Sequence, residues 1–391
     1  MTEVARHWID GKWLDAGPVA TTRDVYRGFD HAAYHVGGAS EAIQAVEAAR
    51  RAFERSVWAH SPRLRAQCLL ELADAIVARR DEIASEIAVE NGKVLSHCLH
   101  ETNAAISECR YYAGLARAIF GRVTEVDEGK QSILAQEPVG VAAIIVPWNA
   151  PATLLIRSLG PALAAGCTTV IKAAHQTSGV NRLYAECVSQ CSSLPPGVVN
   201  FVHGDVDVSK ELCTHVDVDV VSFTGSSATG KAIMASGAPT LKRLSLELGG
   251  KAPAIVFSDA DMERSATEIL RGAIAHAGQM CTAVSRVLVA DGAWHGFVPK
   301  LVAAAQSVKA GDPLDGSVQM GPLFDVPSAE RYESDLAAAR QVGKILLDGQ
   351  VLNGHPVRNV VTPAIYEINE PGHRLVKEEL FSPILMVERF T

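Results

Sequence analysis

The sequence of 391 residues lacks an excess of positive charge and any long uninterrupted apolar run. Its 36 Lys and Arg residues are outnumbered by 44 Asp and Glu residues, so the net charge is -8. Because a surface that follows phosphates needs excess Lys and Arg, we expect no nucleic acid partner. The most strand-like apolar run, 139–147, is too short to span a bilayer, and residues 1–13 carry several charges, unlike a signal peptide. We therefore expect no membrane partner and a cytoplasmic location.

A disulfide framework is also missing. The eight cysteines are spaced irregularly, which fits a reducing compartment. Cys187 and Cys191 are four positions apart and could share one helix face, but no further Cys or His stands at zinc-site spacing nearby. We predict an ordinary buried helix face there, and no metal.

The length predicts about two or three domains, and 48% hydrophobic with 20% charged residues is typical of a globular protein. Apolar residues at spacings of three and four predict several helices over 39–120. Residues 121–137 are polar with scattered β-branched residues and an Asp-Glu-Gly break, which predicts an extended hairpin or arm.

From residue 139 onward, short β-rich runs alternate with helical stretches. The predicted strands are 139–146, 167–172, 198–203, 218–223, 252–257, 286–290 and 384–387, and the predicted helices are 153–165, 178–192, 227–236, 261–276 and 294–308. This alternation predicts an α/β fold with a doubly wound parallel sheet, followed by a second α/β domain that begins near residue 248. Sheets of this kind bind ligands at the carboxyl ends of their strands.

Two short segments carry residues suited to covalent chemistry at a carbonyl group, LELGGK at 246–251 and GQMC at 278–281. Glu247 offers a carboxylate base, and Cys281 offers a soft nucleophile. A single Cys in an apolar stretch is more often buried packing, so on this pair alone both interpretations stay open.

Other candidates stand at the ends of predicted strands. Gly225 and Ser226 enter a helix, where backbone N–H groups bind an anion such as a dinucleotide pyrophosphate or simply form an N-cap. Lys172 ends a strand where a nucleotide ribose would lie, although on this residue alone a solvated strand-end lysine is the more common interpretation. Asn149 could direct a carboxamide at an oxyanion or serve a turn. The acids in KEELFSP, 377–383, suit a charged surface turn.

Taken together, these motifs resemble the aldehyde dehydrogenase superfamily. The resemblance runs nearly from end to end, through WIDGKW (8–13), PWN (147–149), GPALAAG (160–166), LPPGVVN (194–200), FTGS (223–226), ELGGK (247–251), GQMC (278–281) and EELF (378–381). It implies oxidation of an aldehyde to a carboxylate with NAD or NADP. By the same resemblance, Cys281 forms a thiohemiacetal held by Asn149, and Glu247 activates the water that hydrolyses the thioester.

The resemblance also implies cofactor contacts. Lys172 would bind the adenosine ribose, Ser226 in the turn with Gly225 the pyrophosphate, and Glu379 the nicotinamide ribose, with Phe381 packing nearby and Gly249 leaving room for the ring. His175 stands where NAD-preferring members often carry a glutamate, so nothing there rejects a 2′-phosphate, and both NAD and NADP stay open.

The implied organisation has three parts. Residues 1–120 and 138–247 would form a Rossmann-like NAD(P)-binding domain, 121–137 an oligomerisation arm, and 248–391 the catalytic domain. In the family the arm pairs with a strand at the extreme C-terminus of a homo-oligomer, and this sequence stops at Thr391 before such a strand. We therefore predict a C-terminally truncated product or a fragment of a longer protein. The alternative function is a non-catalytic dinucleotide-binding or regulatory homologue.

Substrate choice is predicted from two positions, Ala150 and Arg157. The sequence PWNAP at 147–151 together with Arg157 is similar to vanillin and salicylaldehyde dehydrogenases. We expect an aromatic aldehyde first, and a carboxylated aldehyde paired with Arg157 second. Glu247 disfavours the CoA-acylating branch, since a base for water would compete with the thiol, and a cofactor-free thiol esterase is a lesser alternative.

Overall fold

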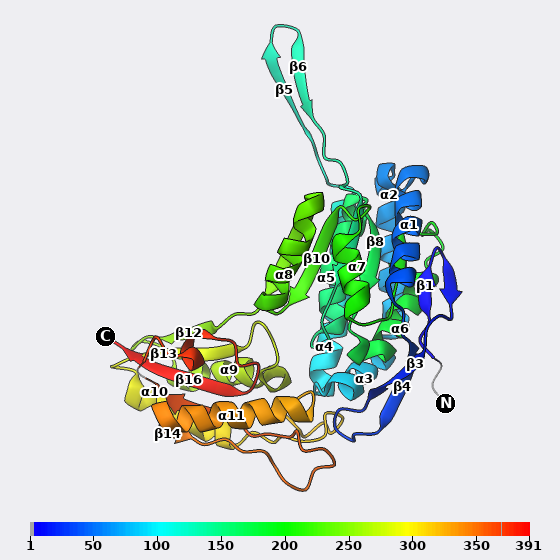
Figure 1. Cartoon of the computed structure of the whole chain (residues 1–391). Helices are drawn as coiled ribbons and strands as arrows, with labels where there is room; N and C mark the ends of the chain where they lie inside the picture. Colours follow the sequence, from blue (N-terminus) through cyan, green and yellow to red (C-terminus); the bar gives the residue numbers. More distant parts are fainter. Residues whose placement is uncertain (1–3, 369) are drawn as a thin grey trace. The chain divides into compact units, whose positions relative to one another are not determined.

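The computed structural model describes residues 4–368 and 370–391, and the chain forms two compact units (Figure 1). The first unit contains residues 4–22, 31–83 and 100–247. The second contains residues 23–30, 84–99 and 248–391 apart from 369. The α/β fold class predicted from the sequence is confirmed in both.

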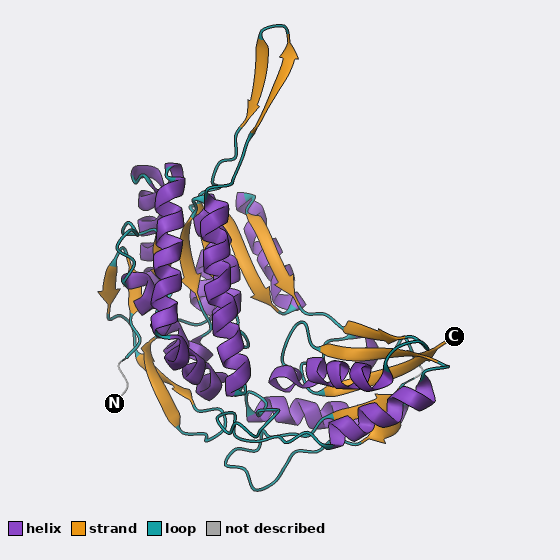
Figure 2. Cartoon of the chain, turned by 180° about the vertical axis from the view of Figure 1, so that it is seen from behind, coloured by secondary structure: helices purple, strands orange, loops and turns teal. Residues whose placement is uncertain are grey.

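A seven-stranded sheet forms the centre of the first unit, in the order β11-β10-β7-β8-β9-β1-β2. Its strands are β1 (His7–Ile9), β2 (Lys12–Leu14), β7 (Val141–Ile145), β8 (Thr168–Lys172), β9 (Val199–Phe201), β10 (Val220–Gly225) and β11 (Arg243–Leu248). β10, β7, β8 and β9 are parallel, and β1 pairs antiparallel with β9 and β2. All five residues of β7 are buried, because helices cover both faces of the sheet (Figures 1 and 2).

The helices alternate with these strands largely as predicted. They are α1 (Ala39–Arg55), α2 (Pro62–Ala78), α3 (Arg80–Asn91), α4 (Leu95–Ala116), α5 (Pro151–Ala165), α6 (Ser178–Ser189), α7 (Val206–Thr214) and α8 (Ser227–Gly237), with short 3-10 turns at Trp58–His60, His175–Thr177 and Ala238–Thr240. α7 was not predicted. α1 packs against β8, and α5 packs against β7 and β8. Ala150, Lys172 and Gly225 therefore follow or end strands that meet at one edge of the sheet.

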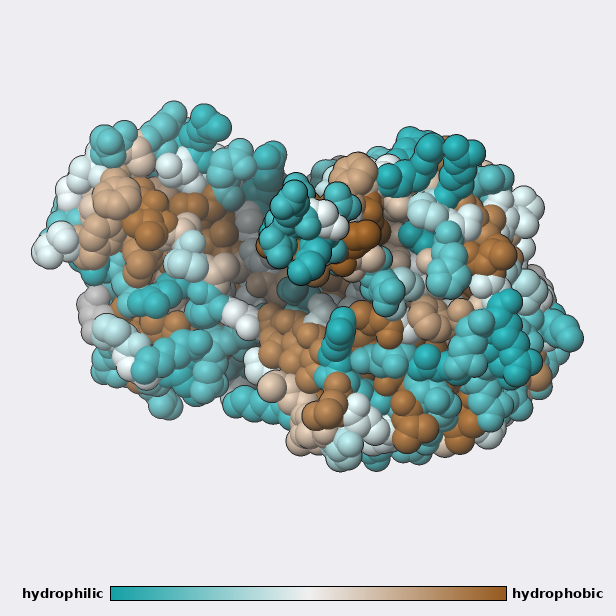
Figure 3. Space-filling view, turned by 90° about the horizontal axis from the view of Figure 1, so that it is seen from above, coloured by the Kyte–Doolittle hydropathy of each residue, from teal (hydrophilic) through white to brown (hydrophobic). Residues whose placement is uncertain are grey.

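The predicted arm is an antiparallel hairpin of β5 (Arg122–Asp127) and β6 (Lys130–Leu134), which extends away from the first unit's sheet and helices (Figure 1). Every residue of both strands is exposed, including Val123, Val126, Ile133 and Leu134. Apolar patches interrupt the polar surface on the face drawn in Figure 3.

The second unit contains a five-stranded sheet in the order β12-β13-β16-β15-β14. Its elements are β12 (Ala252–Val256), α9 (Met262–Ile274), a 3-10 turn (Ala275–Gly278), β13 (Val284–Ala290), α10 (Trp294–Gln306), α11 (Val326–Val342), β14 (Lys344–Leu347), β15 (Ala364–Glu367), α12 (Arg374–Lys377) and β16 (Ile384–Phe390). The first four strands in this order are parallel, and β14 is antiparallel to β15. Phe297, Tyr332 and Tyr366 are fully buried in the core that this sheet shares with its helices.

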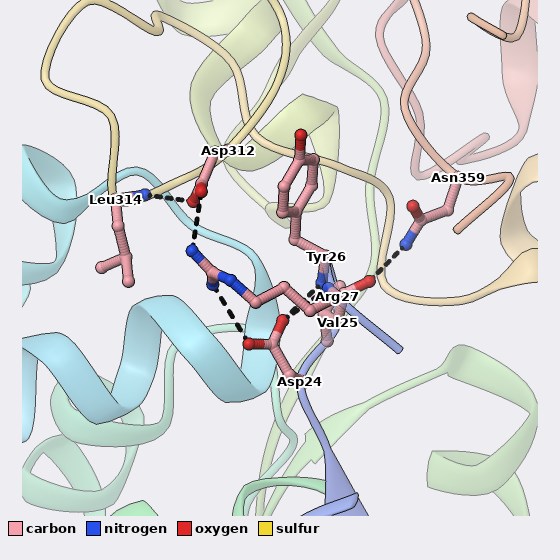
Figure 4. Close-up of polar contacts among 7 residues, drawn as sticks. All are labelled: Asp24, Val25, Tyr26, Arg27, Asp312, Leu314 and Asn359. Carbon is pink, nitrogen blue, oxygen red and sulfur yellow. Dashed lines mark hydrogen bonds and ion pairs between the residues drawn. The ribbon is translucent and has the colours of Figure 1, made fainter. Parts of the chain in front are cut away.

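Two segments of the N-terminal half pack with the second unit, Arg23–Asp30 and Ala84–Leu99. They include parts of α3, α4 and a small sheet of β3 (Val19–Arg23) and β4 (Asp30–His35). Arg27 donates to Asp24 at 3.1 Å and to Asp312 at 2.7 Å, and the Asn359 amide donates to the Val25 carbonyl oxygen at 2.8 Å (Figure 4). The predicted ranges did not anticipate this exchange, because the contacts join residues about 300 positions apart.

No helix in the described parts of the chain is long and apolar enough to cross a membrane. Among the same residues, no group of three or more His, Cys, Asp or Glu side chains could hold a metal ion. Cys187 and Cys191 are both buried on or just after α6.

Candidate active site

Cys281 differs from the other cysteines in its exposure. None of the eight cysteines forms a disulfide; seven are buried, whereas Cys281 is half-buried. It lies on a turn closed by a hydrogen bond from the Ala283 N–H to the Met280 carbonyl oxygen at 3.0 Å. The preceding Gln279 side chain donates to the His276 carbonyl oxygen at 3.0 Å and accepts from the Phe324 N–H at 2.8 Å. The turn that carries the thiol is thus held from both sides.

The backbone before this turn is unusual. His276, Ala277 and Gly278 all have positive φ, at 51°, 53° and 74°. Only glycine adopts this region without strain, so two non-glycine residues there mark a conformation that the surrounding fold imposes. A Cβ at 278 would lie 2.5 Å from the backbone carbon and oxygen of Ser382. Gly278 therefore lets the Cys281 turn contact the loop that follows Phe381, which itself has φ 55°.

Glu379 lies against the glycines of the ELGGK motif. A Cβ at Gly249 would overlap Oε2 of Glu379 and come within 2.8 Å of its Cδ. Desolvation raises the pKa of Glu379, and a hydrogen bond from the Gly250 N–H and the charge of Lys251 only partly offset this effect. The two motifs, 130 positions apart, thus form one local cluster in the second unit.

Lys251 belongs to the same cluster and was not singled out from the sequence. Its Nζ is buried and has no hydrogen-bond partner among the described residues. Burial lowers its pKa to about 8, against the opposing effect of Asp335. A lysine that loses its proton near neutral pH is common at functional sites, although structural networks produce it as well.

Asn149 and Glu247 belong to the first unit, and Cys281 to the second. Asn149 is buried, with 5% of its surface exposed, directly before α5. Glu247 is exposed at the carboxyl end of β11, the edge strand of the seven-stranded sheet. Because the Glu247 side chain is exposed and Gly249 and Gly250 nearby have no side chains, Glu247 has room to change its rotamer.

A cavity of about 440 Å³ opens at the carboxyl ends of β7, β8, β9 and β10. Lys172, His175 and Gly225 line it, together with residues that were not predicted, among them Trp148 and Asp205. The doubly wound order changes direction at β7, and ligands bind at this edge of such sheets. Asp205 could have been found by the same argument, because it follows a predicted strand.

The charged groups of this cavity influence one another. Burial lowers the pKa of Lys172, and Asp205 partly offsets this. Burial and then Lys172 lower the pKa of His175, whose Nδ1 lies 3.8 Å from Asp205 Oδ1. The His175 ring also stacks with Tyr34 at a centroid distance of 6.4 Å. His175 is therefore mainly neutral at pH 7, next to a lysine and a carboxylate.

The predicted anion turn lies at the start of α8. Ser226 is its N-cap, and the Ser226 Oγ accepts from the Thr229 N–H at 3.2 Å. The capping alternative raised from the sequence is thus realised, and the pyrophosphate role of Ser226 stays a prediction. A Cβ at Gly225 would lie 2.5 Å from the Phe223 ring, so the absence of a side chain keeps this wall of the cavity open.

Of the two predicted substrate residues, Arg157 lies on α5 and Ala150 directly precedes it. Ala150 is buried at the N-cap position. Arg157 is exposed, and its Nε donates to Glu108 Oε1 of α4 at 3.0 Å. Glu108 also influences the neighbouring Tyr112, whose pKa is raised by burial and by this carboxylate. Arg157 thus has an internal counter-charge that the sequence did not reveal.

Comparison with known proteins agrees with this geometry. The profile described as "Aldehyde dehydrogenase family" matches residues 20–391. Aldehyde dehydrogenase 1 of Tanacetum cinerariifolium is 38% identical over 356 residues, 88% of this chain and 70% of that protein. An NAD-dependent aldehyde dehydrogenase structure from Sinorhizobium meliloti has a TM-score of 0.96 at 31% identity, covering 100% of this chain and 79% of that one.

An NAD+ complex of aldehyde dehydrogenase from Bacillus cereus has a TM-score of 0.94 at 33% identity, covering 99% of this chain and 80% of that chain. The family and the nicotinamide cofactor predicted from the sequence are confirmed, while the predicted truncation stays a prediction. This chain belongs to the aldehyde dehydrogenase family, NAD(P)-dependent enzymes that oxidise aldehydes to carboxylic acids.

Proposed function

We propose that this chain oxidises an aromatic aldehyde to its carboxylate by covalent catalysis at Cys281. The observation that carries the proposal is the placement of this thiol, half-buried on a turn held by Gln279, while the other seven cysteines are buried. A nucleophile must reach its substrate, and a buried thiol behaves as a small apolar side chain.

The proposed reaction has two stages. The Cys281 thiolate attacks the aldehyde carbon, and the Asn149 carboxamide with the Cys281 N–H donates to the oxyanion of the thiohemiacetal. The nicotinamide ring, when bound, supplies the acceptor for the hydride that leaves this carbon. Glu247 then deprotonates a water molecule, whose attack on the thioester releases the acid and returns the thiol.

The cavity of the first unit fits a dinucleotide. It combines Lys172 at the end of β8, an apolar wall at Gly225 where an added Cβ would press on Phe223, and the N-terminus of α8 with its capping Ser226. In the second unit, Glu379 beside Gly249 supplies a carboxylate for ribose hydroxyls, with Phe381 in the same loop. We propose both NAD and NADP as cofactors. The Lys172 ammonium and the His175 ring do not repel a 2′-phosphate, whereas the Asp205 carboxylate does.

The Arg157–Glu108 pair favours the aromatic substrate over a carboxylated one. The guanidinium already binds a carboxylate of its own chain, so a substrate carboxylate would have to displace it. Tyr112 lies near the same pair, which adds an aromatic surface. The likeness to vanillin and salicylaldehyde dehydrogenases rests on this segment and on Ala150.

We assign dinucleotide binding to residues 1–120 and 138–247, catalysis to 248–391, and assembly of a homo-oligomer to the arm at 121–137. The exposed apolar residues of the arm support the last assignment, because an isolated hairpin is only marginally stable in water. A cytoplasmic location agrees with eight cysteines that form no disulfide.

One experiment tests the proposal. The purified chain is incubated with NAD or NADP and a panel of aromatic and aliphatic aldehydes, and the absorbance of the reduced cofactor is followed. We expect turnover with aromatic aldehydes that disappears in Cys281→Ala and persists in Cys98→Ala, whose thiol is buried in the same unit. Dinucleotide binding without turnover across the whole panel would instead identify a non-catalytic homologue.

A further inference from the structure

Helix α5 begins without a cap of its own. The first N–H groups of a helix have no partner within it, and Ser, Thr, Asp or Asn at the N-cap position usually supplies one. Here the N-cap residue is Ala150, which offers no side-chain acceptor, and Pro151 follows. The buried N–H groups of Ala152 and Thr153 therefore need an acceptor from elsewhere.

Glu101 of α4 supplies that acceptor. Its Oε1 accepts from the Ala152 N–H at 2.9 Å and from the Thr153 N–H at 3.3 Å. A third bond runs in the opposite direction, from Thr153 Oγ1 to the Glu101 carbonyl oxygen at 3.3 Å. Glu101 is buried, with 6% of its surface exposed, so these bonds form away from bulk water.

The Glu101 side chain lies at the N-terminus of α5. The N-terminus of a helix carries partial positive charge, which stabilises a nearby anion. The effect of Glu101 reaches the buried Tyr184, whose hydroxyl has no hydrogen-bond partner among the described residues and whose pKa is raised by burial and by this carboxylate. A charge buried this deeply is costly to keep unless it has a specific partner.

We call the three hydrogen bonds between Glu101 and residues 152–153 the clamp. It begins three residues after Asn149. Because the Ala152 and Thr153 N–H groups donate to Glu101, these two groups are not available to a substrate oxyanion. Asn149 is itself buried just before the clamped turn, between Pro147 and Pro151. Fixing the first turn of α5 from α4 therefore fixes where the peptide that carries Asn149 enters the helix.

We propose that Glu101 is a positioning residue, which holds Asn149 in the orientation needed to stabilise the oxyanion. This inference rests on the proposed function, specifically on the oxyanion role of Asn149. A misplacement of about 1 Å in a catalytic group can lower a rate by about a hundredfold. Loss of the clamp should thus lower kcat while leaving the KM for the cofactor unchanged.

The test is a double-mutant cycle on the full chain with NAD and an aromatic aldehyde. Glu101→Ala is expected to lower kcat by about tenfold to a hundredfold. In an Asn149→Ala background, the same change should lower kcat by less than about twofold, because coupled residues are not additive. Glu101→Gln, which keeps one oxygen acceptor, should restore most of the rate.

Glu71→Ala is the matched control. Glu71 is another carboxylate of the first unit that accepts a backbone N–H, from Ser193 at 2.9 Å, but it lies far along the chain from α5. Both variants should lower Tm, and only Glu101→Ala should lower kcat. Equal losses of kcat, or losses from Glu101→Ala and Asn149→Ala that multiply, would overturn the proposal.

A second measurement does not depend on turnover. Hydrogen exchange of the peptide containing residues 147–154 should become faster in Glu101→Ala and stay unchanged in Glu71→Ala. Unchanged exchange in Glu101→Ala would refute the clamp even in a chain without activity. Faster exchange in a chain that oxidises no aldehyde would instead place the failure in the proposed function.

Discussion

Gly249 and Glu379 are in such close contact that only a hydrogen atom fits on Cα of residue 249 while the Glu379 carboxylate keeps its position. The contact joins the ELGGK motif at 247–251 to the EELF motif at 378–381. If Glu379 binds a cofactor ribose, the glycine is part of the cofactor site without touching the cofactor.

Gly249→Ala should therefore weaken cofactor binding. The added methyl group displaces the Glu379 carboxylate, and losing a hydrogen bond to a charged group costs about 1.5–3 kcal/mol, which is about tenfold or more in KM for NAD. Steady-state kinetics with varied NAD would measure it. Gly250→Ala is the control, because a Cβ there meets nothing within 4 Å. Equal KM values for both variants and the unmodified chain would contradict the link.

Gly278→Ala should destabilise the turn that carries Cys281. Its φ of 74° costs a non-glycine residue about 1–2 kcal/mol, and the Cβ would also press on the Ser382 backbone. We expect a lower Tm and a changed rate of Cys281 alkylation by iodoacetamide. Gly316→Ala, where a Cβ has open space and no positive φ is required, should match the unmodified chain in both measurements.

Acid should destabilise the first unit through His203. This residue is fully buried beside His7, with ring centroids 6.0 Å apart, and burial lowers the pKa of His203 to about 3 from 6.5. Between these two values the unfolded chain binds a proton that the folded chain does not. Stability is thus fully present above pH 6.5 and falls by about 1.4 kcal/mol per pH unit toward pH 3.

Urea unfolding at several pH values would measure this slope. His203→Leu should remove about one proton from the linkage, whereas the exposed His60→Gln should not change it. A slope that is unaltered in His203→Leu would show that other groups are responsible for acid sensitivity.

Asp205→Asn should shift the cofactor preference toward NADP. Asp205 is the carboxylate beside His175 and Lys172 in the cavity, and removing it removes repulsion of a 2′-phosphate. The ratio of kcat/KM for NADP to that for NAD should rise severalfold, which corresponds to about 1 kcal/mol. Asp207→Asn is the control, because Asp207 lies two residues after Asp205, in the first turn of α7, and pairs with Lys210. An unchanged ratio would show that the 2′-hydroxyl of the adenosine ribose does not lie near Asp205.

Glu108→Gln should release Arg157 for an anionic substrate. With its internal counter-charge gone, the guanidinium can bind a carboxylate on the aldehyde, and kcat/KM for 4-carboxybenzaldehyde should rise severalfold relative to benzaldehyde. Asp74→Asn, which removes the partner of the exposed Arg110, is the matched control. If kcat/KM changes equally for both aldehydes in Glu108→Gln, Arg157 does not contact the substrate.

Much of the fold was readable from the sequence. Short, continuous apolar runs rich in β-branched residues predicted β7, β8, β9 and β10. Apolar residues at spacings of three and four predicted the helices of 39–120. Each pattern follows from which faces of an element are covered. The hairpin at 121–137 was predicted from turn residues. The strands β14 and β15 and the helix α7 were missed, because they are short and carry weak patterns. The 17-residue helix α11 was missed as well.

The candidate site was predictable only in part. Cys281, Glu247, Asn149 and Glu379 stood out because their residue types suit the chemistry and their neighbours match a family. Glu101 and Asp205 carried no such signal, since a single acid in a helix or after a strand is ordinary. Their partners, the N–H groups of α5 and the ring of His175, are contributed by distant parts of the chain.

By itself, the sequence determined the residue types, the order of strands and helices, and the family, since these depend on local patterns and on motifs read in order. The tertiary structure alone decided which groups meet: Glu101 with the uncapped start of α5, Glu108 with Arg157, Glu379 with Gly249, and Arg27 with Asp312. The physical reason is that a hydrogen bond or an ion pair depends on distances of a few ångströms, which only packing sets when the partners lie tens to hundreds of residues apart.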